Sequence, residues 1–193
     1  MKQRADAEEN QNALMAAASE VFAEHGVDAP LDLIRMRAGV GRATMYRHFP
    51  DRRVLHLALV ARSLERFETC RPKPGNRTVD LVDLLELAAQ EAARSPALHA
   101  VWDKVRLDPD AAELVDRLTA VFSGPLQRAK KAGGATAWLC VEDMFLAVRM
   151  LGAASRGVSQ PARQAEAARA LSILIEGLGI RPPAPLEFQD DTV

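Results

Sequence analysis

One stretch decides the fold of the first third of this chain: Ala38-Gly39-Val40-Gly41-Arg42-Ala43-Thr44-Met45-Tyr46-Arg47-His48-Phe49. Gly39 lies between two short helical segments, at a point where the backbone needs a positive φ. Glycine adopts that conformation without steric cost. Val40 then follows as an apolar plug beneath the turn, and the residues from 42 to 48 are expected to form one short helix.

The expected helix 42–48 has two chemically different sides. Ala43 and Met45 supply an apolar side, and Phe49 closes the end of the helix. The opposite side offers hydrogen-bond donors suited to phosphate oxygens and base edges, on Arg42, Thr44, Tyr46, Arg47 and His48. The stretch therefore predicts the turn and second helix of a helix-turn-helix, although an ordinary αα-hairpin with a charged outer face would share this pattern.

The segments on either side favour the helix-turn-helix. Upstream, a helical segment ends on Gly26, and downstream Pro50 and Asp51 precede the start of another helix. This N-terminal run resembles the TetR family of bacterial transcriptional regulators over about the first third of the chain. The residues that match the family pattern in order and spacing are Ala17, Ala18, Phe22, Gly26, Ile34, Ala38, Gly39, Val40, Thr44, Met45, Tyr46, His48, Phe49 and Leu55.

The resemblance implies roles for individual residues. Arg42 is the expected guanine contact, because one guanidinium can bond both O6 and N7. Tyr46 and Arg52 are expected to hold phosphates, and His48 either does the same or caps the helix. Gly41 exposes backbone N–H groups at the helix start, where the helix dipole favours an anion. The full DNA-facing set is Gly41, Arg42, Ala43, Thr44, Tyr46, Arg47, His48 and Arg52.

Four positions depart from the usual pattern of the family. A hydroxyl residue is usual at Pro30, Ala at Arg35, Ser at Gly41 and Lys at Arg52. Arg35 must turn outward from a tight helix crossing. Arg52 keeps a cation at the start of the next helix, where an arginine can hold phosphate through two hydrogen bonds. These changes affect individual contacts and not the motif.

The distribution of charge is more informative than its total. The formal net charge of the 193 residues is −1, which by itself says nothing about nucleic acid. Between Arg35 and Arg53, however, six arginines stand against one acidic residue, Asp51, which gives a local charge of about +5. A basic face of this kind is typical of DNA-binding proteins, although solvated charged faces are common.

The rest of the sequence predicts an all-α fold of about nine helices. We expect a helix-turn-helix DNA-binding domain at residues 1–56 and an effector-binding and dimerisation domain at 57–193. Helix 52–70 is shared by both domains and, at 1.5 Å per residue, is about 28 Å long. Residues 1–8 are expected to be a frayed arm, and 180–193 irregular. The other expected helices include 9–25, 78–94, one starting at Ser95-Pro96, 111–131 with a kink at Pro125, 135–156 and 159–177.

The last two expected helices are apolar on more than one side, so each needs neighbours on most sides. A body this small supplies those neighbours on one side only. We therefore expect a two-fold homodimer built on a four-helix bundle, in agreement with how TetR-like proteins dimerise; a buried central helix in a monomer is the alternative. Two such heads would contact half-sites about 34–36 Å apart or somewhat more, in a near-palindromic operator of double-stranded DNA. The expected interface residues are Phe145, Val148, Leu171, Leu174 and Leu178.

TetR-like regulators usually bind a small molecule in the body, and binding moves the shared helix so that the heads no longer fit DNA. The resemblance thus implies a repressor released by an effector whose identity the sequence does not show. The alternative is a DNA-binding protein of the same fold whose body contacts a protein partner, which a filled core would favour. Candidate pocket residues are Phe67, Leu84, Trp102, Arg106, Phe122, Trp138 and Met144.

Catalytic and metal-binding patterns do not stand out. The sequence shows no paired acids, Ser-His-Asp set or metal-ligand spacing, so no enzymatic activity, cofactor or metal is expected. Cys70 and Cys140 lie far apart, which makes a disulfide framework unlikely and fits a reducing compartment. The N-terminus is polar, and no apolar run is long enough to span a membrane. These features predict a cytoplasmic protein without a membrane partner.

Overall fold

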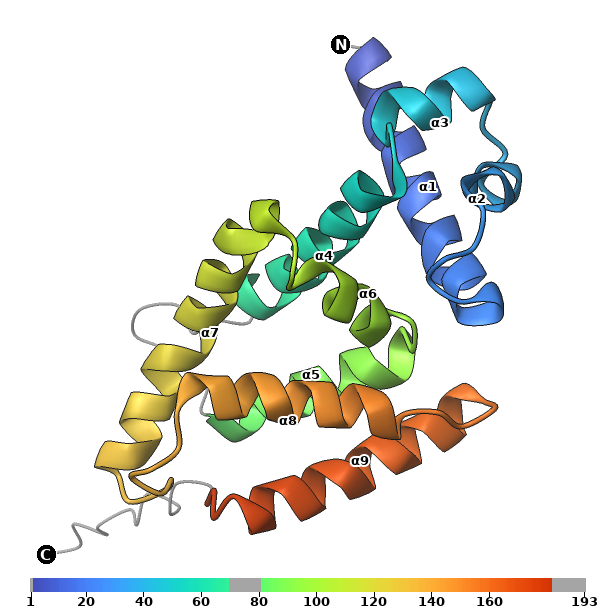
Figure 1. Ribbon diagram of the computed structural model, residues 1–193. Helices are drawn as coiled ribbons and strands as arrows, with labels where there is room; N and C mark the ends of the chain where they lie inside the picture. The colour runs from blue at the N-terminus through green and yellow to red at the C-terminus, as the bar shows by residue number, and fades with distance from the viewer. Residues whose placement is uncertain (1, 70–80, 182–193) are drawn as a thin grey trace, which may run out of the picture.

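The computed structural model describes residues 2–69 and 81–181, and every regular element within these ranges is helical (Figure 1). An N-terminal head of three helices is joined by α4 to a body of five helices. The fold is all-α, as the sequence predicts. The elements are α1 (Lys2–His25), α2 (Leu31–Ala38), α3 (Arg42–His48), α4 (Arg52–Thr69), α5 (Leu81–Arg94), α6 (Leu98–Val105), the 3₁₀ turn η1 (Pro109–Ala111), α7 (Ala112–Lys131), α8 (Val141–Ala154) and α9 (Gln160–Gly177).

The head is held together by apolar side chains from all three of its helices. Leu14 and Phe22 of α1 pack with Ile34 of α2 and Met45 of α3, and Phe49 closes the end of α3; each is at most 2% exposed. Burying a large apolar side chain contributes about 1.5–3 kcal/mol. The orientation of α3 is therefore set by the face that carries Met45 and Phe49.

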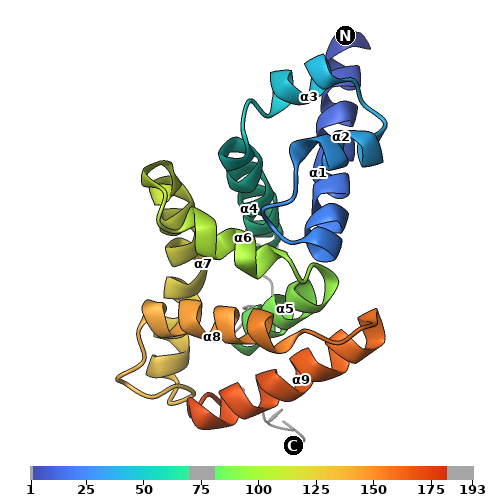
Figure 2. The ribbon, with the colours of Figure 1, turned by 45° about the vertical axis from the view of Figure 1, so that its right-hand side comes forward.

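Helix α4 contributes to both the head and the body. It packs against α1 at its start and against α6 and α7 farther along. Leu55, Val60 and Leu64 have no exposed surface, and Phe67 near the end of the helix is 6% exposed. Figures 1 and 2 show α4 running from the end of α3 down into the body.

The body is arranged around α5, which packs against α7, α8 and α9. Leu84 and Leu85 of α5, Phe122 of α7 and Met144 of α8 are at most 2% exposed. The helices α8 and α9 lie side by side along one edge of the body in both views (Figures 1 and 2).

The predicted helix 135–156 is wrong at both ends, because α8 spans only Val141–Ala154. The Asp143 side chain accepts a hydrogen bond from the Cys140 backbone N–H at 2.7 Å, which caps the helix and fixes its start. The preceding apolar run is a loop whose Leu139 is fully buried. Trp138 points away from the core and is 64% exposed.

Two further helix boundaries differ from those that the sequence predicts. The helix α1 begins at Lys2, so most of the expected frayed arm is helical. The helix expected at Ser95-Pro96 begins at Leu98, because the Leu98 N–H donates to the Ser95 carbonyl at 3.0 Å in a preceding turn. By contrast, α9 follows a Ser159 cap and ends at Gly177, as predicted.

Several sequence predictions fall outside the described residues. They concern Cys70, the start of the expected helix 78–94 and residues 182–193. Within residues 2–69 and 81–181, no helix combines the length and the apolar character that crossing a membrane requires.

The two glycines of the turn supply a matched test of backbone conformation. Gly39 has a φ of 70° and Gly41 a φ of −69°, and a Cβ at either would meet nothing within 4 Å. Gly39→Ala should therefore lower the free energy of unfolding by about 1 kcal/mol or more, because L-residues are strained at positive φ.

Gly41→Ala should instead raise the free energy of unfolding by about 0.4–1 kcal/mol, because it restricts only the unfolded chain. Urea denaturation of both variants measures the two changes. Equal effects of the same sign would show that φ is not what distinguishes the two positions.

Candidate nucleic-acid interface

The turn between α2 and α3 is built as the sequence predicts. Gly39 adopts the left-handed conformation at the end of α2, and the Val40 N–H donates to the Arg35 carbonyl at 3.1 Å. Gly41 then precedes α3 in extended conformation, without a side-chain cap. This geometry turns α3 across α1 and α2 at the end of the head remote from α8 and α9 (Figure 1).

The outer face of α3 carries the donors predicted for DNA contact. Arg42, Tyr46 and Arg47 are exposed, and Thr44 is half-buried. The Arg42 guanidinium lies over the Tyr46 ring, 5.6 Å from its centroid, in a cation–π contact. Ala43 also lies on this exposed face, so its assignment to the apolar side of the helix is wrong. Seven residues make about two turns, and in this short helix Met45 alone is buried.

Four of the six arginines in the basic stretch are paired with carboxylates. Three of the acids belong to α1 and α2, one to the loop between them, and two to the segment that follows α6. The pairs are Arg35 with Asp32 at 2.5 Å, Arg37 with Glu20 at 3.1 Å and Glu24 at 2.7 Å, Arg52 with Asp28 at 3.4 Å, and Arg53 with Asp108 at 2.5 Å and with Asp110. The local charge of about +5 is thus largely neutralised.

Arg42 and Arg47 are the exception within this stretch. Neither forms a salt bridge with any residue that the structure describes. Both belong to α3, where positive charge remains available on the exposed face. A guanidinium without a carboxylate partner breaks no salt bridge when it contacts a phosphate or a guanine, which makes these two arginines the strongest candidates for DNA contact.

His48 and Arg52 lie less favourably for direct contact. The His48 Nε2 atom is buried and has no hydrogen-bond partner among the described residues, so it does not reach the surface in this conformation. Arg52 is accessible, but a phosphate there must compete with the Asp28 carboxylate.

Ion pairs also connect the head to α6 and to the segment after it. Lys104 of α6 donates to Asp28 at 3.1 Å and holds the pKa of that carboxyl below its usual value. Arg53, at the start of α4, donates to Asp108, and this contact lowers the pKa of the Asp108 carboxyl. These pairs join segments that lie 76 and 55 residues apart in sequence.

A buried histidine fastens α4 to the head. The ring of His56 is 5% exposed, lies edge-on to Phe22 with centroids 5.3 Å apart, and has Nε2 3.2 Å from the Val27 carbonyl. With Nε2 protonated, the neutral ring donates to that carbonyl. Burial lowers the pKa of His56, because the charged imidazolium loses its water.

A family model for "Bacterial regulatory proteins, tetR family" matches residues 14–59, which run from α1 through the turn and α3 into α4. The N-terminal part of the chain therefore belongs to the TetR family. The chain is accordingly a DNA-binding transcriptional regulator, and the family resemblance seen in the sequence is confirmed.

Curated TetR relatives include proteins of both regulatory signs. The HTH-type transcriptional repressor BepR of Brucella suis is 26% identical over 167 residues, covering 77% of this chain and 80% of its own. The HTH-type transcriptional activator FasR of Mycolicibacterium smegmatis is 39% identical over 59 residues, which are 30% of this chain and 27% of its own.

Solved TetR structures match the whole fold. A TetR transcriptional regulator from Streptomyces coelicolor is 26% identical, with a TM-score of 0.57, and the match covers 90% of this chain and 99% of that one. A tetR-family regulatory protein from Rhodococcus RHA1 is 19% identical with a TM-score of 0.64, covering 90% and 98%. The latter match shows the fold alone.

The residues predicted to line an effector pocket lie partly in the core and partly at the surface. Phe67 and Phe122 belong to the core, with ring centroids 6.4 Å apart, and Phe122 also meets Phe145 at 6.5 Å. Leu84 and Met144 are likewise buried. Trp102 is half-buried, whereas Arg106 and Trp138 are exposed, so sequence periodicity did not distinguish pocket from core.

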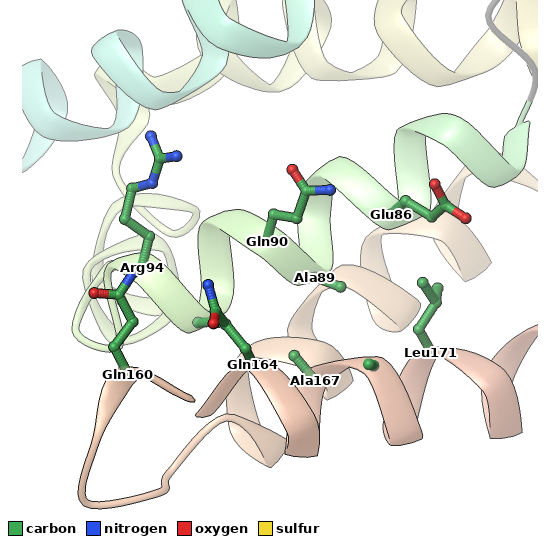
Figure 3. A pocket seen from close by; sticks show the side chains of 10 residues that line it. Glu86, Ala89, Gln90, Arg94, Gln160, Gln164, Ala167 and Leu171 are labelled. Carbon is green, nitrogen blue, oxygen red and sulfur yellow. The ribbon is translucent and has the colours of Figure 1, made fainter. Parts of the chain in front are cut away.

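A hollow of about 470 Å³ lies between α5 and α9 of the body, and Figure 3 shows the side chains that line it. Gln90 and Arg94 line it from α5, and Gln160 and Gln164 from α9, above a floor of small residues and Leu171. Nothing in the sequence singled out these residues, because scattered glutamines on helix surfaces are common.

The acidic residues that pair with Arg52 and Arg53 are the other feature that sequence analysis missed. Asp28, Asp108 and Asp110 carry no motif, and each meets its arginine only after the chain has folded. A charge count over a window of sequence does not include partners from distant segments.

The stability of the TetR-family head should depend on the protonation of His56. Because its pKa is lowered in the folded state, the unfolded chain binds the proton more tightly. Stability is fully present above the ordinary histidine pKa of about 6.5 and falls as the pH drops below it. His99, whose pKa burial also lowers, adds to the same slope.

Urea denaturation between pH 7.5 and pH 5 measures this slope before most carboxylates titrate. His56→Gln should make it shallower, because the group whose folded-state pKa burial lowers is then absent. Identical slopes in wild type and His56→Gln would contradict the assignment.

Proposed function

We propose that this TetR-family regulator is a repressor that binds a near-palindromic operator as a homodimer and is released by a small-molecule effector. The observation that carries the DNA-contact assignment is the pair of unpaired arginines, Arg42 and Arg47, on the exposed face of α3. Within the head proposed for residues 1–56, Arg42 contacts guanine and Tyr46 and Arg47 hold phosphates. Gly41, Ala43 and Thr44 lie at the same surface, and Arg52 joins them when a phosphate displaces Asp28.

The sign of regulation is proposed from the relative that matches most of the chain. The repressor BepR aligns with 77% of this sequence, including much of the body, whereas the activator FasR aligns with only 30%. The body, and not the head, determines how a DNA-bound regulator responds to its signal.

The proposed homodimer rests on exposed apolar residues of α8 and α9. Leu146 and Met150 of α8 are 51% and 48% exposed, and Ile173 of α9 is 56% exposed. Water-exposed apolar side chains on two adjacent helices favour an isologous four-helix interface. The five residues expected from the sequence are half-buried or buried inside the subunit, so the proposed interface is shifted to the outer faces of the same helices.

Release by an effector would act through α4 and α6. A ligand that binds the body must favour one arrangement of these helices over another to change DNA affinity. The contacts of Lys104 with Asp28 and of Arg53 with Asp108 supply a route, since they link α6 and the segment after it to the head.

The filled core favours a second candidate function, in which the body binds a protein partner and no small effector. Phe122 and Met144 are fully buried, and the hollow in Figure 3 lies on the outside of the body. Operator release by added protein, without any small molecule, would support this alternative.

Selection of bound duplexes from a random DNA pool, at stated salt, tests the proposal. An enriched palindrome whose half-sites lie about one helical turn apart, or somewhat more, supports a dimeric repressor head. An enriched single half-site would contradict the dimer, and weak binding without a motif would contradict sequence-specific contact by α3.

On the selected operator, Arg42→Ala should weaken binding and also relax base preference, whereas Arg47→Ala should weaken binding to all sequences alike. Each lost phosphate contact should reduce the log–log salt slope by about 0.9. Arg128→Ala, at an exposed position on α7, is the matched control. Fluorescence anisotropy across a salt series measures the effects, and unchanged binding by the Arg42/Arg47 double variant would overturn the assignment.

The dimer is tested by charging its proposed surface. The Leu146→Glu/Met150→Glu variant should sediment as a monomer at micromolar concentration and lose cooperative operator binding, because four carboxylates would meet across the two-fold axis. Leu107→Glu, at a site 74% exposed in the turn after α6, should remain dimeric. A double variant that sediments like wild type would place the interface elsewhere.

A further inference from the structure

A cleft of about 170 Å³ lies at the junction of head and body, on the side of α4 that faces α1. Its walls come from four segments: α1, the middle of α4, the end of α5, and the start of α6 with the turn before it. It is separate from the hollow in Figure 3, although Arg94 borders both.

The cleft carries an excess of positive charge. Arg62, Arg66 and Arg94 line it, with Glu91 as the one acidic residue among its lining side chains. Arg66 Nη1 lies 2.8 Å from both carboxylate oxygens of Glu91, and Arg94 lies 3.7 Å from one of them. Glu91 is 7% exposed and its charge is already matched, so a surplus of about +2 remains.

Arg62 and the hydroxyls of Ser63 and Ser95 supply unused donors, whereas the Ser19 hydroxyl already donates to the Met15 carbonyl at 3.1 Å. Arg62 is half-buried and forms no salt bridge with the part of the chain that the structure describes. The Ser63 hydroxyl, beside it on α4, belongs to a residue 7% exposed and has no hydrogen-bond partner among the described residues. Ser19 of α1 and Ser95 at the end of α5 complete the polar lining.

We propose that this cleft binds a small oxyanion, with Arg62 as its main charge partner and the Ser63 hydroxyl as a second donor. Guanidinium groups and hydroxyls are the donors that phosphate and carboxylate groups prefer. The volume of about 170 Å³ is below the roughly 300–1,000 Å³ of pockets for drug-sized molecules, so it suits a single phosphate or a small dicarboxylate.

An anion in this position would touch the head and the body together. Ser19 belongs to α1, Arg62 to α4, and Ser95 to the turn between α5 and α6. Because binding stabilises the arrangement that binds, the anion would favour the present placement of the head relative to the body. The proposal depends only on these residues, and it does not depend on whether the regulator is a repressor.

The test measures the melting temperature of the full-length protein against inorganic phosphate and, separately, succinate, with sodium chloride adjusted to constant ionic strength. One of the two oxyanions should raise the melting temperature in a saturable manner, and which one does so distinguishes a phosphate from a carboxylate ligand. Arg62→Gln should weaken the apparent affinity by about tenfold or more, because a hydrogen bond between charged groups is lost.

Three further variants test whether anion binding is specific to this cleft. Arg169→Gln removes an exposed arginine outside the cleft and should bind as wild type. Gln164→Ala alters only the hollow between α5 and α9 and should also leave binding unchanged. Ser63→Ala, which keeps every charge, should weaken binding less than Arg62→Gln does.

The proposal is overturned if neither anion gives a saturable shift, or if Arg62→Gln and Arg169→Gln weaken binding equally. Loss of binding in Gln164→Ala alone would move the anion to the other hollow and would also overturn it. No DNA is present in this assay, so a negative result leaves the operator-binding proposal intact.

Discussion

The structure depends on one helix being part of two cores. Leu55 of α4 is buried against the head, while Leu64 and Phe67 are buried in the body. Each such side chain contributes about 1.5–3 kcal/mol by leaving water. Neither end of α4 can be released without exposing several of these residues, so a displacement of the body end must be transmitted to the head. The hydrogen bond between His56 and Val27 strengthens this attachment at the head end.

The positive charge that the head exposes depends on which of its arginines pair with carboxylates, and not on how many arginines it contains. Arg37 and Arg53 are each held by two carboxylates, and the pKa of each guanidinium is raised by those contacts. Such pairs position helices, but because the carboxylates offset the charge of each arginine, little positive electrostatic potential remains to attract a polyanion. The guanidiniums of Arg42 and Arg47, which form no salt bridge with the described residues, lie on the exposed face of α3. A chain with a net charge of −1 thereby presents positive charge to DNA over a small area.

Local sequence signals predicted much of the head correctly. Features that depend on contacts between distant segments could not be predicted in this way. Gly39 has a positive φ, α1 ends just before Gly26, and Met45 and Phe49 are buried, as predicted. The start of α8 was missed because an apolar run looks the same in a buried loop and in a helix, and the cap by Asp143 decides between them. Pocket and interface residues could not be settled from the sequence for a related reason: periodicity identifies an apolar face but not which neighbour covers it.

The carboxylate of Asp28 is shared by Arg52, a proposed DNA-contact residue, and by Lys104 of the body. Arg52 and Lys104 both bind it, at 3.4 and 3.1 Å, from the start of α4 and from α6. A phosphate that engages Arg52 removes one of the two cations, and Asp28 then relies on Lys104 alone. If a change in the body withdraws Lys104, Asp28 attracts Arg52 more strongly and opposes the phosphate. Because coupling between two binding events is reciprocal, DNA at Arg52 must in turn favour the arrangement that keeps Lys104 beside Asp28.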